Sequence, residues 1–315
     1  PKVHNNLETA FDKYLPNAEY ISGPKKIKSY NVSKKKCCGY FLTGLVPILV
    51  RYLKTLGIGP IIKDQRTKPD PCFKRKEKLK GLDTLRTSQE EVLKACEENS
   101  RGLIEAPTGF GKTECFISLV NEKAVPAMVL VFSTSLLTQT RERMAERLDI
   151  SEDEIGLIGD GVCYLPNGKD TPIIIAMVPT LFKQVVPPQV KRFSNKKQQE
   201  KQQQALDNFE QNELLKKAME SRDLVIVDEV HHFHSAMGEY KRLMEFFPKA
   251  YYRYGFSALP FNDVTSRKCN FNNANQVQLT GLFGDTLYSM LYMEAVDDGI
   301  LIPPKVYCVD YTRDY

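Results

Sequence analysis

A short glycine-containing segment, Ala-Pro-Thr-Gly-Phe-Gly-Lys-Thr at residues 106–113, constrains the fold of this 315-residue chain more than any other feature. It follows the apolar run at 103–105 and precedes a helical pattern over 114–120. This order predicts a strand, a tight loop and then a helix. The alternative is a chance glycine turn, and the flanking strand and helix patterns argue against it.

The residue types of this loop suit the binding of phosphate. Gly109 and Gly111 let backbone N–H groups approach phosphate oxygens, and the N-terminus of the following helix adds the positive end of its dipole. Lys112 supplies a point charge, and Thr113 can ligate Mg²⁺. The segment departs from the pattern G-x-x-x-x-G-K-[ST] because Ala106 stands in place of the first glycine. The predicted nucleotide-binding residues of the loop are Pro107, Thr108, Gly109, Phe110, Gly111, Lys112 and Thr113.

Two adjacent carboxylates follow a second apolar run. Residues 224–227 (Leu-Val-Ile-Val) predict a buried strand that ends in Asp228 and Glu229. Ligands of open α/β sheets bind at the carboxyl ends of the strands. Asp228 is therefore predicted to hold Mg²⁺ through water, and Glu229 to orient or deprotonate an attacking water. An apolar run that ends in Asp-Glu is more often a strand meeting a polar loop, but together with the phosphate loop it becomes a strong signal.

From residue 81 to 315, short apolar runs alternate with helical patterns, which predicts a parallel α/β sheet. The predicted strands lie at 103–105, 128–132, 173–177, 224–227, 253–257 and 306–309. A stretch rich in Lys and Gln lies between Phe182 and Asp223, with apolar residues at loosely helical spacing. We expect this stretch to form helices that project from the sheet and do not join the core.

The first 80 residues differ sharply in charge from the rest. They hold 18 Lys and Arg against 6 Asp and Glu, whereas the remaining residues hold 26 against 33. Strand-like runs at 18–21 and 27–32 and a helical pattern over 44–57, with Pro47 in its first turn and Gly57 as C-cap, predict a small basic α+β domain. Residues 63–80 are charged and contain little apolar content, so we expect a linker that completes this 1–80 unit.

Such a concentration of positive charge points to an anionic partner, most simply nucleic acid. A solvated basic segment is the alternative. The leading candidates for phosphate contacts cluster near Tyr30 and Tyr40, and they are Lys25, Lys26, Lys28, Lys34, Lys35 and Lys36.

Composition excludes several classes. With 42% hydrophobic and 26% charged residues the chain is neither disordered nor fibrous. The longest apolar run, at 40–50, is interrupted and too short to cross a bilayer, so no membrane partner is expected. Eight scattered cysteines without a C-x-x-C pair favour a reducing cytoplasm. His231, His232 and His234 invite a metal interpretation, but consecutive histidines leaving a strand are expected to point to different sides, and no cysteine is near.

The motifs together resemble those of a known family. The Asp-Glu-Val-His box that begins at Asp228, the loop at 106–113 upstream and the element Gly-Phe-Ser-Ala-Leu-Pro at 255–260 downstream resemble the first motor domain of superfamily 2 helicases. The Ser-Ala-x-Pro element looks like motif III, so the resemblance gives Ser257 and Ala258 a role in coupling ATP hydrolysis to nucleic-acid movement. We assign His231 to the same coupling.

Three further segments agree with the resemblance. Residues 85–89 resemble the adenine-reading Q-like motif, which implies nucleotide contacts for Arg86 and Gln89. Residues 133–136 resemble motif Ia, although a serine replaces part of its common Pro-Thr pattern, and residues 177–181 resemble motif Ib. In the family these strand-end loops contact the nucleic-acid backbone, which implies such contacts for Thr134, Ser135 and Thr180.

Within the superfamily, residues 155–161, 281–284 and 298–304 look most like DNA-directed XPB- and UvsW-type enzymes, and residues 39–45 loosely resemble the small DNA-binding module of phage UvsW-type helicases. The resemblance implies a RecA-like P-loop NTPase domain, the cofactors ATP and Mg²⁺, and forked, branched or duplex DNA as partner in replication, recombination or repair. A phage origin would place the protein in the cytoplasm of a bacterial host. Family members also need a second motor domain, which these residues do not include, so we expect part of a longer helicase with weak ATPase activity of its own.

Three alternatives stay open. An RNA helicase is the nearest, although the Q-like element does not have the DEAD-box form and the box reads Asp-Glu-Val-His. A restriction-type DNA translocase subunit would act with a nuclease or methylase partner. A nucleic-acid-binding module without turnover belongs to a different class.

Overall fold

The structure is a computed structural model. It describes residues 19–22, 25–28, 30–33, 38–82, 84–186, 200, 212–235, 237–261, 269 and 273–303. For residues 19–41 and 234–239 within these ranges it describes the backbone only.

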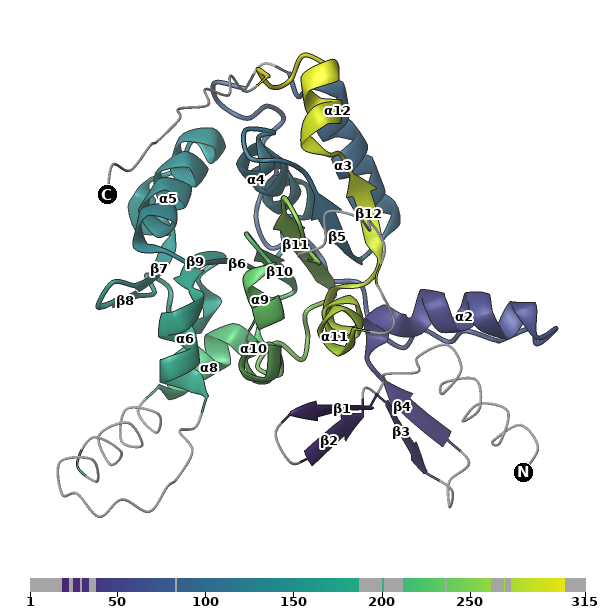
Figure 1. The fold of residues 1–315 in the computed structure, drawn as a ribbon. Helices are drawn as coiled ribbons and strands as arrows, with labels where there is room; N and C mark the ends of the chain where they lie inside the picture. Colours follow the sequence, from purple (N-terminus) through teal and green to yellow (C-terminus); the bar gives the residue numbers. More distant parts are fainter. Residues whose placement is uncertain are drawn as a thin grey trace, which may run out of the picture.

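The described part of the chain is built around an eight-stranded sheet in the order β12-β5-β11-β10-β6-β9-β7-β8 (Figure 1). All neighbouring strands pair in parallel except β7 and β8, which form an antiparallel edge. The strands are β5 (Arg101–Glu105), β6 (Ala127–Val131), β7 (Gly156–Gly159), β8 (Val162–Tyr164), β9 (Ile173–Met177), β10 (Leu224–Val227), β11 (Tyr252–Ser257) and β12 (Thr286–Ser289). The predicted α/β class is confirmed, and five predicted strands lie where expected. The sixth, at 306–309, lies outside the described residues.

Side chains alternate across the sheet, so that each face carries its own core. Leu224 and Ile226 belong to one buried cluster, whereas Val225 and Val227 belong to the other. The first face is covered by α3 (Thr87–Glu98), α4 (Lys112–Lys123), α5 (Thr134–Leu148) and α12 (Tyr292–Asp297). The second is covered by α6 (Val178–Val185), α8 (Glu213–Glu220), α9 (His232–Ser235), α10 (Met237–Met244) and α11 (Ala274–Phe283) (Figure 1). Short 3-10 turns η2 (Glu152–Glu154) and η3 (Gly168–Asp170) lie in connecting loops.

The N-terminal region combines hairpins with a helix, in agreement with the predicted α+β character. The hairpins are β1 (Glu19–Ser22) with β2 (Lys25–Lys28), and β3 (Tyr30–Ser33) with β4 (Cys38–Phe41), followed by the turn η1 (Thr43–Leu45) and α2 (Val46–Thr55). Pro47 lies in the first turn of α2, and Gly57 beyond its end has a φ of +72°. Leu45 is buried within the core of the second sheet face, where η1 packs on α11.

The segment expected to be a linker lies along the surface of the motor region. No helix or strand occurs between residues 58 and 82. Its backbone is nevertheless anchored, since Lys76 N donates to Asn121 Oδ1 at 2.8 Å and Asn121 Nδ2 donates to Lys76 O at 2.9 Å. Lys80 N also donates to Arg147 O at 2.9 Å.

For the last part of the Lys/Gln-rich stretch, the expectation of a projecting helix is wrong. Helix α8 does not project from the sheet, because Leu215, Ala218 and Met219 form an apolar face that is buried in the core. Arg222 follows the helix, is 1% exposed and donates to backbone carbonyls, among them Thr171 O at 2.6 Å. The spacing of three apolar residues outweighs the polar composition around them. Residues 187–199 and 201–211 of the stretch lie outside the described residues.

Candidate functional site

The predicted phosphate loop follows the carboxyl end of β5 and leads into α4. Gly109 and Gly111 have φ values of +87° and +90°, a region that side chains rarely adopt. Gly111 is also the N-cap of α4. A methyl group on Gly111 would overlap the amide of Gln89, and one on Gly109 would lie 2.8 Å from a methyl group of Leu301. Both glycines are therefore required by the backbone and by close neighbours.

The ammonium group of Lys112 is enclosed at the base of this loop. The residue is 9% exposed, and its Nζ donates to Ala106 O at 3.0 Å and to Pro107 O at 3.4 Å. The same Nζ lies 3.8 Å from Glu229 Oε1. A buried cation beside a glycine-containing loop at a helix N-terminus is suited to a polyphosphate.

Asp228 and Glu229 follow β10 in the turn beyond the strand. Glu229 has a φ of +51°, an uncommon conformation for this residue type, and its N–H donates to Asp228 Oδ1 at 3.0 Å. Burial, and secondly the charge of Glu229, raise the pKa of Asp228 to about 6, while Lys112 acts in the opposite direction. The charged form of Asp228 is thus disfavoured by its surroundings, and a bound divalent cation would stabilise it. With the hydroxyl of Thr113, this donor set fits Mg²⁺.

Arg86 and Gln89 lie against the phosphate loop at the start of α3. Gln89 is 4% exposed and donates from Nε2 to Phe110 O at 3.1 Å, while the guanidinium of Arg86 donates to the same carbonyl. Arg86 N donates to Gln89 Oε1 at 3.0 Å, which fixes the orientation of the amide. These two residues therefore brace the loop; contact with adenine stays a prediction.

The structure brings His231 to Ser257. Because β10 pairs with β11 in parallel, the turn after β10 lies beside the end of β11, and His231 Nδ1 is 2.9 Å from Ser257 Oγ. The same nitrogen is 3.2 Å from Glu229 Oε2. The motif at 255–260 thus lies in direct contact with the turn that contains Asp228 and Glu229, which we call the carboxylate turn.

The expectation that His231 and His232 point to different sides is wrong. Their rings stack with centroids 4.3 Å apart. The reason is local: the chain turns after Asp228 and enters α9 at His232, so the alternation of an extended strand does not apply. Burial, and secondly His231, lower the pKa of His232.

The predicted motif Ia and Ib segments begin the helices after β6 and β9. Ser133 caps α5 by accepting a hydrogen bond from Leu136 N at 3.3 Å. Thr134 Oγ1 lies 3.9 Å from Met177 Sδ, and Thr180 is in the first turn of α6. The two segments are therefore neighbours at the same edge of the sheet as the phosphate loop. Lys25, Lys26 and Lys28 lie on β2, where only the backbone is described, and Lys34, Lys35 and Lys36 lie outside the described residues.

Two supporting contacts were not predicted. Glu105 is 3% exposed, accepts a hydrogen bond from the hydroxyl of Ser289 and, through its carbonyl, one from Met290 N at 2.9 Å. Leu301 lies against Gly109. Both pairings join segments almost 200 residues apart, and no local pattern in the sequence signals such contacts.

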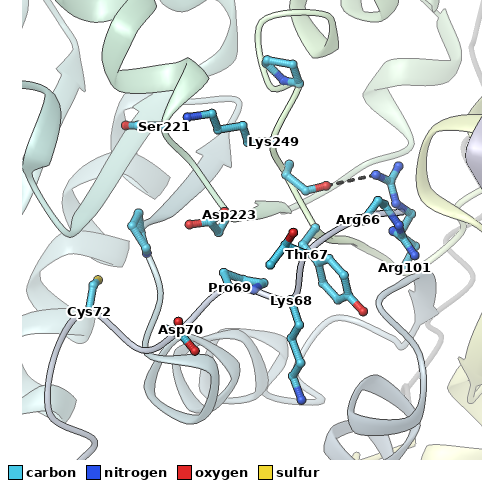
Figure 2. Close-up of a pocket in the computed structure, with 14 residues that line it drawn as sticks. Arg66, Thr67, Lys68, Pro69, Asp70, Cys72, Arg101, Ser221, Asp223 and Lys249 are labelled. Atoms are coloured by element: carbon cyan, nitrogen blue, oxygen red, sulfur yellow. Dashed lines mark hydrogen bonds between the residues drawn. The ribbon is translucent and has the colours of Figure 1, made fainter. Parts of the chain in front are cut away.

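A cavity of about 710 Å³ lies elsewhere (Figure 2). Its lining includes Arg101 at the start of β5, together with Asp223 and Tyr251, which precede β10 and β11. It is therefore at the amino ends of the strands, the edge opposite the phosphate loop. Figure 2 shows Lys68 and Lys249 of this cavity extending in different directions.

The sheet and the order of its motifs define the RecA-like motor domain of a superfamily 2 helicase. The sequence profile of the family described as Type III restriction enzyme, res subunit, matches residues 82–262, more than half of the chain. The chain belongs to this family. The resemblance to XPB- and UvsW-type helicases is confirmed by the relatives described next.

Two relatives, one of them in two structures, illustrate the similarity. The DNA 3'-5' translocase XPB2 of Sulfurisphaera tokodaii is 28% identical over 150 residues, a match that covers 48% of this chain and 29% of that protein. The UvsW helicase from bacteriophage T4 has the same fold, with a TM-score of 0.60 and 16% identity over 89% of this chain and 93% of that one. A second T4 UvsW structure gives a TM-score of 0.57 and 15% identity over 89% of this chain and 53% of that one. Within the described residues, no helix is both long and apolar enough to pass through a membrane.

Proposed function

We propose that this chain is the ATP-binding motor of a DNA helicase or translocase that uses ATP and Mg²⁺ to remodel forked or branched DNA. The observation that carries the proposal is the convergence of Lys112, Glu229 and His231 at one edge of the sheet. Lys112 Nζ is 3.8 Å from Glu229 Oε1, and Glu229 Oε2 is 3.2 Å from His231 Nδ1. Coupled ATP hydrolysis needs a cation that binds phosphate, a carboxylate that orients water and a contact that links the site to a neighbouring strand.

Each residue has a distinct role in this proposal. The backbone of residues 107–113 cradles the phosphates, and Lys112 exchanges its contacts with the loop carbonyls for contacts with the β- and γ-phosphates. Thr113 and Asp228 would hold Mg²⁺, which would supply positive charge beside the phosphates when bound. Glu229 orients the attacking water and accepts its proton. His231 and Ser257 transmit structural changes at Glu229 to the rest of the domain.

DNA as the partner is supported by three observations. The S. tokodaii relative is named a DNA translocase, and the T4 structure of the same fold is a helicase from a phage. The first 80 residues, which we propose as a basic DNA-binding unit with a linker before the motor at 81–315, carry 18 basic and 6 acidic residues. Phosphate contacts from Lys25, Lys26 and Lys28 on β2, and from Thr134, Ser135 and Thr180 at the motor edge, would hold the DNA backbone.

A restriction-type DNA translocase subunit is the second candidate, because the matching family is named for a restriction enzyme subunit. The two candidates differ in partner: a restriction subunit would co-purify with a nuclease or methylase, and a recombination helicase would act without one.

The test uses ATP hydrolysis by the full-length protein alone and with single-stranded, duplex, forked and four-way DNA, and with RNA of matched sequence. We expect stimulation by DNA, greatest for forked or four-way substrates, and little by RNA. Greater stimulation by RNA would replace the proposal with an RNA helicase, and hydrolysis that no nucleic acid stimulates would contradict it.

A further inference from the structure

Aromatic side chains from separate elements meet beside the candidate site. They are Phe132 after β6, Phe182 on α6, His232 and Phe233 on α9, and Tyr240 on α10. The ring centroid of Phe132 is 4.4 Å from His232, 6.0 Å from Phe233 and 5.7 Å from Tyr240. That of Tyr240 is 6.4 Å from Phe182. These separations are typical of interacting aromatic pairs. We call this set the aromatic cluster.

One end of the aromatic cluster leads to the predicted DNA-binding loops. Phe132 directly precedes Ser133, which caps α5 and begins the motif Ia segment. Phe182 lies one turn into α6, whose first residues form the motif Ib segment. The rings of Phe132 and Phe182 are thus attached to the same short segments that begin the two predicted DNA-binding loops.

The other end leads to the carboxylate turn. The His232 ring stacks on that of His231, with centroids 4.3 Å apart, and His231 Nδ1 contacts both Glu229 and Ser257. The two neighbouring strands are joined here by a hydrogen bond from Asp228 N to Leu130 O at 2.9 Å. A rotation of the His231 side chain would therefore change its contact with the His232 ring.

We propose that His232 and Phe132 are positioning residues that transmit the state of Glu229 and His231 to the motif Ia and Ib loops. This inference rests on the proposed function, because it presupposes that ATP and DNA bind at these two places. Phe132 is partly buried, and His232 is exposed. Phe132 also packs against the buried core, so removing its ring should cost some stability, whereas removing the exposed ring of His232 should cost little.

The experiment measures coupling in the full-length protein. DNA affinity is determined with and without a non-hydrolysable ATP analogue, and analogue affinity with and without DNA; the two ratios must agree because coupling is reciprocal. Phe132→Leu and His232→Leu remove one ring each, while Phe132→Tyr and His232→Phe keep a ring in place. The matched control is Tyr251→Leu, which removes a partly buried ring that lies 4.8 Å from Tyr252 at the opposite edge of the sheet.

We expect both Leu variants to reduce the coupling ratio by about threefold or more, with each separate affinity within about twofold of the original protein. Phe132→Tyr, His232→Phe and Tyr251→Leu should keep the ratio. Combined with His231→Ala, Phe132→Leu should reduce coupling no further than the more severe single variant, because both interrupt one chain of contacts. Melting temperatures identify any variant that fails to fold. If Phe132→Leu fails to fold, the coupling ratio of His232→Leu, at an exposed position, decides whether the inference holds.

Unchanged coupling in both Leu variants, or His232→Phe behaving like His232→Leu, would overturn the inference and leave the proposed function intact. Absence of coupling in the original protein would instead contradict the proposed function together with the inference.

Discussion

Nδ1 of His231 lies 2.9 Å from the hydroxyl of Ser257, although 26 residues separate them in the chain. The parallel pairing of β10 with β11 creates this contact, because it places Val227 opposite Gly255 and so sets the turn after β10 beside the end of β11. Since His231 also contacts Glu229 at 3.2 Å, a change at this carboxylate, which we propose to be catalytic, can reach a second strand through one imidazole.

Substitution at either end of this contact should uncouple the two ligands and spare nucleotide binding. We expect His231→Ala and Ser257→Ala to reduce the stimulation of ATPase by DNA by about five- to tenfold or more, a loss of about 1 kcal/mol or more of coupling. ATP affinity, measured with a fluorescent analogue, should stay within about threefold. A variant that lost ATP binding and kept its DNA stimulation would show that the contact serves the nucleotide site alone.

The charges of Lys112 and Glu229 should affect separate steps. Lys112→Ala should reduce ATPase activity by about 100-fold or more and weaken nucleotide binding, because it removes the buried cation at the loop. Glu229→Gln keeps the shape of the side chain but cannot accept a proton, so it should bind ATP and hydrolyse it at least about 100-fold more slowly. Circular dichroism checks that both proteins are folded. Hydrolysis at the original rate in either protein would remove that residue from the site.

Gly111→Ala tests the bracing of the phosphate loop, and Gly57→Ala is its matched control. Both glycines have positive φ, so alanine at either position should cost about 1–2 kcal/mol of backbone strain. A methyl group at Gly57 has nothing within 4 Å, whereas one at Gly111 would displace Gln89. We expect nucleotide affinity to fall in Gly111→Ala only. Titration with an ATP analogue distinguishes the two, and equal losses would show that the displaced amide is irrelevant.

Arg222 should contribute strongly to stability. Its guanidinium donates to Thr171 O at 2.6 Å, Lys169 O at 2.7 Å and Ala218 O at 2.8 Å. Arg222→Ala would leave these carbonyls without that donor, and we expect the free energy of unfolding to fall by about 3 kcal/mol or more. The control is Arg51→Ala, whose pair with Asp285 is solvent-exposed and should be worth about 1 kcal/mol or less. Denaturant titration of both proteins gives the comparison.

The basic strand β2 should contribute phosphate contacts. Replacing Lys25, Lys26 and Lys28 with Glu should weaken DNA binding without changing sequence preference. The log–log dependence of affinity on salt should become shallower by about 0.9 for each phosphate of duplex DNA that the protein no longer neutralises. Fluorescence anisotropy at several salt concentrations measures this slope. An unchanged slope would indicate that these lysines form a solvated face and that DNA binds instead at the motif Ia and Ib segments.

The sequence was most informative where function requires a local pattern. The phosphate loop, the strand before Asp228 and the strand before motif Ib could be placed to within a residue or two, because buried parallel strands are continuous apolar runs and the loop needs its glycines. The contact between His231 and Ser257 could also be expected, since it follows from adjacent parallel strands.

Other features depend on contacts that no local pattern encodes. β12 has four partly buried residues and pairs with β5 from far along the chain, so neither alternation nor a long apolar run marks it. The stacking of His231 on His232 depends on a turn whose geometry includes the positive φ of Glu229. The carbonyls that bind Arg222 come together only when β9 and α8 are packed.

The packing of η1 on α11 restricts the movement of residues 43–45 relative to the sheet. A methyl group on Gly44 would overlap the backbone of Thr280, Gly281 and Gly284, so the two segments are in backbone contact, with Leu45 sealed beneath them. The turn that leads out of the N-terminal hairpins therefore cannot swing independently of the ATP-binding sheet. The residues that connect the basic hairpins to the rest of the chain are thus fixed to the sheet and move with it.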